Sequence, residues 1–226
     1  EFDVKGTKDN VPILLHDDTL IRTTDFDVKL DIKHIEYEIV QKYEAGGWFS
    51  EEFYGEKIPT LEEALELIAG SITAFIDVKT TNPMIEAEIV RLIEVYGMEN
   101  SVKILSFDAN QLQRFKELNP NLETVLLISV FFGQIDTLFE LDYIDHFGLR
   151  ISILQRDPEI TYRIHRFGKK VYAWTADTRE DIAIGVKADV DGFITKRPIE
   201  AREIAHSKSS NETFTELLQR LFGITQ

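Results

Sequence analysis

Short apolar runs alternate with amphipathic helical segments along nearly the whole chain, and this alternation constrains the fold more than any other feature. Most of the runs are continuously hydrophobic and rich in β-branched residues, which is typical of parallel strands covered on both faces. Because strands and helices alternate, we predict an α/β fold of right-handed βαβ units around a parallel sheet. The predicted strands are residues 2–5, 11–16, 72–79, 102–106, 124–129, 147–153, 170–175 and 190–194.

Helix start signals stand between these runs. Thr60 and Glu63 have the spacing of a capping box, and Asp108 and Gln111 repeat that spacing before another amphipathic segment. Each pair predicts the beginning of a helix. The other expected elements are helices that begin after residues 82, 157 and 178, and a hairpin turn at residues 5–10.

Residues 17–58 lack this regularity and contain several glycines and aromatic residues. We interpret this stretch as an insertion after the second strand. Long irregular segments inside compact domains often have a functional role. We predict one domain over residues 1–206, including the insertion at about 17–58. A polar linker and an amphipathic helix are expected at residues 207–226, with the helix at about 214–222.

Charge and composition exclude several functions. The chain of 226 residues has 40 acidic and 25 basic residues and a formal net charge of −15, so we expect no nucleic-acid partner. No apolar run reaches the ~18–20 residues of a membrane span. Cysteine is absent, which excludes disulfides, thiolate zinc sites and a cysteine nucleophile. This composition suits a cytoplasmic or an extracytoplasmic protein equally, and it leaves the oligomeric state open.

Carboxylates lie on the first and third predicted strands. Glu1 and Asp3 are two residues apart, so both side chains project to one face of the first strand. Burying such a pair costs several kcal/mol unless a cation or an ion pair compensates. Asp77 on the third strand could complete a site with three oxygen ligands, which would favour Ca²⁺ or Mg²⁺. Ordinary ion pairs or exposure to solvent are the alternative interpretation.

Three further side chains lie at predicted strand ends. His16 could act as a general acid or base beside carboxylates, or it could be a structural histidine. Lys79 could pair with a carboxylate or hold a substrate phosphate. Trp174 could line the core or a pocket.

Several ordered motifs resemble the glycerophosphodiester phosphodiesterase family. The segment from Glu1 to Thr24 is similar to the family pattern Glu-x-Asp-Val, Thr-Lys-Asp-Gly, an apolar strand ending in His-Asp, and Leu-x-Arg-Thr-Thr. The resemblance extends over residues 1–205. The further matching motifs are Ala45-Gly-Gly-Trp-Phe49, Ile58-Pro-Thr-Leu-Glu-Glu63, Phe75-Ile-Asp-Val-Lys79, Ser106-Phe-Asp108, Val171-Tyr-Ala-Trp-Thr175 and Asp191-Gly-Phe-Ile-Thr195.

This resemblance implies a TIM-type (β/α) barrel that hydrolyses a small glycerophosphodiester to glycerol 3-phosphate and an alcohol with a divalent cation, Ca²⁺ or Mg²⁺. His16 would be one of two acid–base histidines and would protonate the leaving alcohol. Lys79 would hold phosphate or glycerol oxygens, and Trp174 would line the pocket. The metal ligands that the resemblance implies are Glu1, Asp3 and Asp77.

The chain departs from the family pattern at three places. The His-Arg-Gly and Glu-Asn-Thr motifs of the family's first βα unit do not occur in it, so we expect that unit to precede Glu1 in a longer biological chain. Asp77 stands where the family usually has Glu, and the shorter side chain could bring in a water or move the cation. The usual Asn after Trp-Thr is shifted or replaced, because Trp174-Thr-Ala-Asp177 occupies that motif.

Two other functions are compatible with the same motifs. The chain could be a catalytically silent family member that binds a phosphodiester or a partner protein, an interpretation that the missing His-Arg-Gly motif favours. It could also be a related phospholipid-cleaving barrel of the sphingomyelinase D type. The insertion after the second strand favours the phosphodiesterase family over this last alternative.

Overall fold

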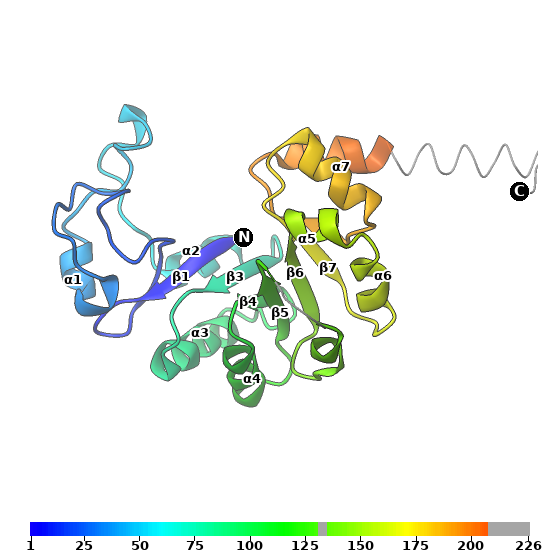
Figure 1. Ribbon diagram of the computed structural model, residues 1–226. Helices are drawn as coiled ribbons and strands as arrows, with labels where there is room; N and C mark the ends of the chain where they lie inside the picture. The colour runs from blue at the N-terminus through cyan, green and yellow to red at the C-terminus, as the bar shows by residue number, and fades with distance from the viewer. Residues whose placement is uncertain (131–134, 208–226) are drawn as a thin grey trace, which may run out of the picture. The chain divides into compact units, whose positions relative to one another are not determined.

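The computed structural model of the chain describes residues 1–130 and 135–207. The chain divides into two compact units, Glu1–Leu126 and Leu127–Gln226 (Figure 1). Among the described residues, no helix is both long and apolar enough to span a bilayer. The helix predicted at residues 214–222 lies outside the described residues, and the division at residues 206 and 207 stays a prediction.

The strands of the first unit pair mostly in parallel. The β1–β2 hairpin is antiparallel, as the turn residues predict, and β1 also pairs in parallel with β3. The order of pairing is β2-β1-β3-β4-β5. In this register Asp3 lies opposite Asp77, so the first and third strands bring two acidic residues together. The strands are β1 (Phe2–Gly6), β2 (Pro12–Leu14), β3 (Ala74–Val78), β4 (Val102–Ser106) and β5 (Glu123–Ile128).

Three longer helices follow these strands, at α2 (Leu61–Ile68), α3 (Pro83–Val95) and α4 (Ala109–Leu118). All three begin where the sequence predicts.

The N-terminal caps of two of these helices differ. Thr60 and Glu63 form the predicted capping box of α2. Asp108 caps α4 by accepting a hydrogen bond from the backbone N–H of Asn110. The Asp108 N–H donates to Ser106 Oγ, so Gln111 does not complete a second capping box and its side chain bonds elsewhere.

Residues 17–58 fold around apolar side chains of their own. They contain the 3₁₀ helices η1 (Ile32–His34) and η2 (Glu51–Phe53) and the short helix α1 (Tyr37–Val40). Figure 1 shows this segment in blue and cyan beside the strands of the first unit. Burial of these apolar side chains stabilises residues 17–58, which have little regular secondary structure. The buried cluster is Ile13, Leu15, Leu20, Phe26, Ile32, Ile35, Val40 and Ile58.

The second unit continues the alternation of strands and helices. Strands β6 and β7 pair in parallel, and β7 pairs in parallel with β8. A helix occupies residues 198–207 at the end of the described chain. The other elements are η3 (Asp136–Glu140), β6 (His146–Arg150), α5 (Ile151–Arg156), α6 (Ile160–His165), β7 (Val171–Trp174), α7 (Arg179–Lys187) and β8 (Gly192–Phe193).

Several predicted strands are too long, and two of these differences bear on the argument. Residues 151–153 begin α5 instead of extending β6, because a short apolar run does not distinguish a buried helix from a buried strand. The second strand ends at Leu14, so His16 follows it by two residues and lies in a bend. Both errors concern boundaries, and every predicted strand position contains a strand.

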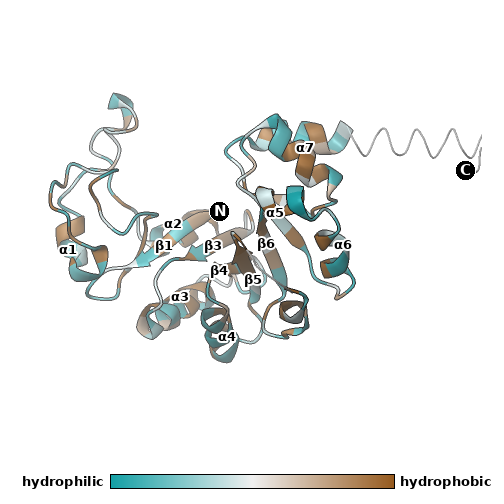
Figure 2. Ribbon diagram, viewed as in Figure 1, coloured by the Kyte–Doolittle hydropathy of each residue, from teal (hydrophilic) through white to brown (hydrophobic). Residues whose placement is uncertain are grey.

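The central strands form the core. Every residue of β5 except the first is buried, and Figure 2 shows β4 and β5 in the brown of hydrophobic residues. In the first unit, α3 and α4 pack beside these strands with Ile85, Ile89 and Phe115 fully buried.

The capping box of α2 provides a direct test of local stability. We expect Thr60→Ala to lower the free energy of unfolding by about 1 kcal/mol, because the N–H of Glu63 loses its acceptor. Chemical denaturation measures this change. Ser71→Ala, at an exposed position, serves as the control and should stay within about 0.5 kcal/mol of the wild type. Equal stability of all three proteins would contradict the role of the cap.

Candidate metal and acid–base site

Three carboxylates come together on β1 and β3. One oxygen from each of Glu1, Asp3 and Asp77 lies within 4.8 Å of the other two. The parallel pairing of β1 with β3 places Asp3 opposite Asp77, and Glu1 projects to the same face as Asp3. Glu1 is exposed, Asp3 is partly buried and Asp77 is buried. The sequence-predicted ligands therefore meet at one place.

Lys79 joins this cluster. Its Nζ lies 2.5 Å from Asp77 Oδ2 and 3.2 Å from Asp3 Oδ1, and 5.3 Å from the centre of the Phe107 ring. The ion pair that the sequence offered as one interpretation of Lys79 is thus present. A single ammonium beside three carboxylates leaves an excess of negative charge when all are ionised.

The environment of the cluster disfavours this excess charge. Burial, together with the charge of Asp3, raises the pKa of Glu1. Burial also raises the pKa of Asp77, although the hydrogen bond and the charge of Lys79 oppose the rise. For Lys79, burial alone would lower the pKa, but the bond and the charge of Asp77 raise it. The site would accept more positive charge than Lys79 supplies.

One oxygen of Asp77 lacks a hydrogen-bond donor. Oδ1 of Asp77 is buried and accepts no hydrogen bond from any residue in the described part of the chain. A buried oxygen without a donor is costly unless another group satisfies it. Three carboxylate oxygens are hard ligands, which suit Ca²⁺ or Mg²⁺. The residues present could therefore hold a divalent cation.

His16 lies at the start of the insertion with its imidazole exposed. Its Nδ1 is 2.8 Å from Asp17 Oδ1, and Asp17 also accepts two hydrogen bonds from Arg22, at 2.5 Å and 3.0 Å. The hydrogen bond from Arg22, opposed by burial and assisted by His16, lowers the pKa of Asp17 to about 2. The Arg22 guanidinium lies 5.8 Å from the centre of the Trp48 ring. Asp17 therefore stays ionised, and its hydrogen bond to Nδ1 orients the imidazole of His16.

Asp17 contacts His16 and Arg22 contacts Asp17, and sequence reasoning gave neither residue a role. Both stand in motifs that carry the family resemblance, His16-Asp17 and Leu20-Ile-Arg-Thr-Thr24. The signal that could have found them is the acidic neighbour of a candidate acid–base histidine, followed closely by an arginine.

Trp174 belongs to the second unit. Its indole Nε1 donates to the carbonyl oxygen of Gly148 at 2.9 Å, and its side chain is partly buried beside β6. A role for Trp174 in a substrate pocket stays a prediction.

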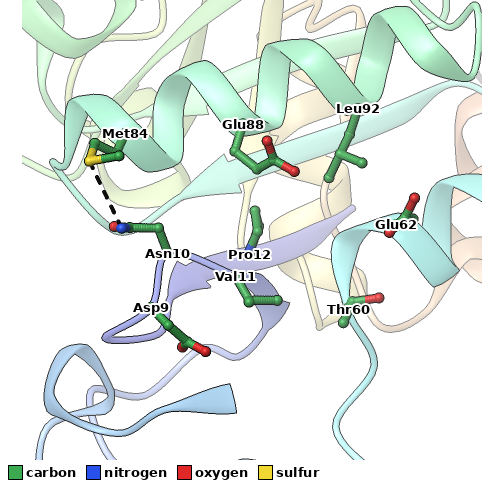
Figure 3. A pocket seen from close by; sticks show the side chains of 9 residues that line it. All are labelled: Asp9, Asn10, Val11, Pro12, Thr60, Glu62, Met84, Glu88 and Leu92. Carbon is green, nitrogen blue, oxygen red and sulfur yellow. Dashed lines mark hydrogen bonds between the residues drawn. The ribbon is translucent and has the colours of Figure 1, made fainter. Parts of the chain in front are cut away.

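A separate pocket of about 440 Å³ lies between the β1–β2 turn, the start of α2 and α3 (Figure 3). Its acidic side chains already have partners. Asp9 accepts from Thr7 Oγ1 and from the Tyr37 N–H, and Glu88 binds Arg91 through two hydrogen bonds. The lining residues are Asp9, Asn10, Val11, Pro12, Thr60, Glu62, Met84, Glu88 and Leu92, and none is a predicted site residue.

Comparison with known proteins identifies relatives across most of the chain. The family model described as the glycerophosphoryl diester phosphodiesterase family matches residues 1–200. A glycerophosphodiester phosphodiesterase of Caldanaerobacter subterraneus subsp. tengcongensis is 33% identical over 202 residues, which cover 88% of this chain and 82% of the relative.

Solved structures are similar as well. A glycerophosphodiester phosphodiesterase from Agrobacterium tumefaciens has a TM-score of 0.73 at 22% identity, covering 88% of this chain and 84% of that chain. An Oleispira antarctica phosphodiesterase in complex with the product sn-glycerol-3-phosphate has a TM-score of 0.77 at 24% identity, covering 89% and 82%. These similarities confirm the predicted (β/α)-barrel fold class.

The Asp17–Arg22 pair makes a testable pH dependence. We expect Arg22→Gln to raise the pKa of Asp17 toward the ordinary value of about 3.9, measured by NMR of the carboxyl carbon. Because the pKa of Asp17 is lowered in the folded protein, its stabilising effect is complete above about pH 4 and is lost as the pH falls through 2. The difference in the free energy of unfolding between the wild type and Arg22→Gln should therefore shrink as the pH falls from about 4 to about 2.

Arg91→Gln is the matched control, since Arg91 forms a similar two-bond pair with Glu88 on α3. It should leave the pKa of Asp17 unchanged. A pKa of Asp17 that is the same in wild type and in Arg22→Gln would show that Arg22 does not hold this carboxylate.

Proposed function

The chain belongs to the glycerophosphoryl diester phosphodiesterase family, and from this premise we propose that it hydrolyses a small glycerophosphodiester to glycerol 3-phosphate and an alcohol with a divalent cation. The observation that carries this proposal is the convergence of three carboxylates, from β1 and β3, within 4.8 Å. The glycerol 3-phosphate bound to the Oleispira antarctica phosphodiesterase supports the substrate class.

In this proposal Glu1, Asp3 and Asp77 would hold the cation, and Asp77 would contribute the buried oxygen that has no hydrogen-bond donor. When bound, a divalent cation neutralises charge on a phosphate oxygen and lowers the pKa of a bound hydroxyl or water. The raised pKa values of Glu1 and Asp77 support this assignment, because added positive charge would relieve their repulsion.

His16 would donate the proton to the departing alcohol. An alkoxide is a poor leaving group, so protonation at its oxygen lowers the barrier to P–O cleavage. Asp17 bonds to Nδ1, which leaves Nε2 of the exposed ring for the substrate. Arg22 keeps Asp17 ionised, so the carboxylate stays in place as the hydrogen-bond partner of Nδ1 and orients the ring.

Lys79 would bind a phosphate or glycerol oxygen of the substrate. Its ammonium lies at the carboxylate cluster, with 20% of its side chain exposed. Two of its three donor protons face Asp77 and Asp3, so one proton would serve a substrate oxygen. Trp174 would line the substrate pocket. The cation would be Ca²⁺ or Mg²⁺, since the oxygen ligands suit both.

Cation binding can be measured without any assumption about the reaction. We expect isothermal titration calorimetry of the full-length protein with Ca²⁺ or Mg²⁺ to show one site, and Asp3→Asn and Asp77→Asn to weaken it by more than about tenfold. Glu36→Gln removes an exposed carboxylate that pairs with Lys8, away from the cluster, and should leave the affinity unchanged. No binding to the wild type would contradict the proposed metal site.

Hydrolysis tests the role of His16. We expect His16→Ala to lower kcat for glycerophosphocholine by about 10²–10⁴-fold, because the leaving alcohol loses its acid. His34→Ala, at an exposed histidine on η1, should retain the wild-type rate. An unchanged rate in His16→Ala would eliminate the assigned role. Cation binding without hydrolysis by the full-length wild type would instead support a family member that only binds a phosphodiester.

A further inference from the structure

We propose that Gln111 is a positioning residue for Lys79: a buried polar network from α3 and α4 holds the backbone directly after β3, from which Lys79 reaches the carboxylates. The role of Lys79 toward substrate rests on the proposed function. The hydrogen bonds that hold the backbone at Lys79 and Thr80 do not depend on that function. The network also gives a structural role to Ser106, which belongs to the Ser106-Phe-Asp108 motif.

Gln111 uses its whole amide group. Its Nε2 donates to the carbonyl oxygen of Thr80 at 2.7 Å and to Glu86 Oε1 at 2.9 Å. Its Oε1 accepts from Ser106 Oγ at 2.7 Å. The side chain is fully buried, so its orientation is set by these three bonds without competition from solvent.

Glu86 and Arg114 hold the other end of the network. Arg114 donates to both carboxylate oxygens of Glu86, with Nε and Nη2 each at 2.7 Å. Glu86 is fully buried on α3, and such a charge is tolerated only when it is paired and hydrogen-bonded. The two-bond geometry fixes the carboxylate that in turn accepts from Gln111.

Thr80 is held from two sides. Its carbonyl accepts from Gln111, and its Oγ1 accepts from the backbone N–H of Gly6 on β1 at 3.1 Å. The preceding residue, Lys79, donates its N–H to the carbonyl oxygen of Val4 at 2.9 Å. The backbone at Lys79 is therefore fixed to β1 and, through Thr80, to α4.

A fixed backbone matters here because the Lys79 side chain is long. Its ammonium must reach oxygens of both Asp77 and Asp3, and an error of about 1 Å in such a group can cost about 10² in rate. Apolar side chains could fill the space of the network at lower desolvation cost. The presence of the polar side chains Gln111, Glu86 and Arg114 at this place is explained if they orient the loop that carries Lys79.

Backbone hydrogen exchange tests the contacts directly. In Gln111→Leu we expect the Lys79 and Gly6 amides to exchange about tenfold faster than in wild type, since the loop loses about one hydrogen bond. The control is Asn119→Leu, which removes a part-buried side-chain amide bond from the C-cap of α4 to Glu94 on α3. It should leave exchange at Lys79 and Gly6 unchanged. Equal rates in wild type and Gln111→Leu would overturn the proposal.

A double-mutant cycle tests whether Gln111 acts through Lys79. We expect Gln111→Leu to lower kcat/KM about tenfold in the wild type and less than about twofold in the Lys79→Met background. A tenfold loss in both backgrounds would show that Gln111 affects only overall stability. If the full-length protein hydrolyses no glycerophosphodiester, the proposed function fails, and the exchange rates still decide whether Gln111 holds the loop.

Ser106→Ala covers the case in which Gln111→Leu does not fold. It removes the hydroxyl that donates to Gln111 Oε1, so the amide group loses one of the bonds that set its orientation. We expect the same direction of change in exchange at Lys79, and no change there would overturn the proposal.

Discussion

The parallel pairing of β1 with β3 is the contact on which the site depends. It places Asp3 opposite Asp77, with Glu1 on the same face, although proximity of three carboxylates is electrostatically unfavourable. Lys79 offsets part of that repulsion and is itself held by the register, because its N–H bonds to β1. A shift of this pairing by one residue would turn the acidic side chains of one strand to the opposite face. The register therefore determines which charged side chains meet at the site, and with them its net charge.

Much of the fold follows from local signals in the sequence. Capping residues such as Thr60 predicted where helices begin, and apolar runs predicted where strands lie. Glu1 and Asp3 could be placed on one face from their spacing alone. By contrast, residues 151–153 contain two β-branched isoleucines, and their helical state depends on tertiary packing that the local sequence does not indicate.

The contacts around the site were harder to predict because they join residues far apart in the chain. Gln111 has the spacing of a capping residue, yet it bonds to Thr80, thirty-one positions away. The oxygen that a capping box would use accepts from Ser106 Oγ instead of the Asp108 N–H, and a local spacing rule could not choose between these two donors. The roles of Asp17 and Arg22 were missed for a different reason. They lie close together in sequence, but their effect on His16 depends on side-chain geometry that spacing does not specify.

The insertion at residues 17–58 surrounds a cluster of apolar side chains that it supplies largely itself. Polar contacts tie the segment to its surroundings: Arg22 donates to Asp17 beside His16, and Lys5 on β1 pairs with Asp18. Substitutions at its exposed positions would leave both these contacts and the apolar cluster in place. The segment can therefore vary at its surface while the strands that carry the carboxylates keep their register.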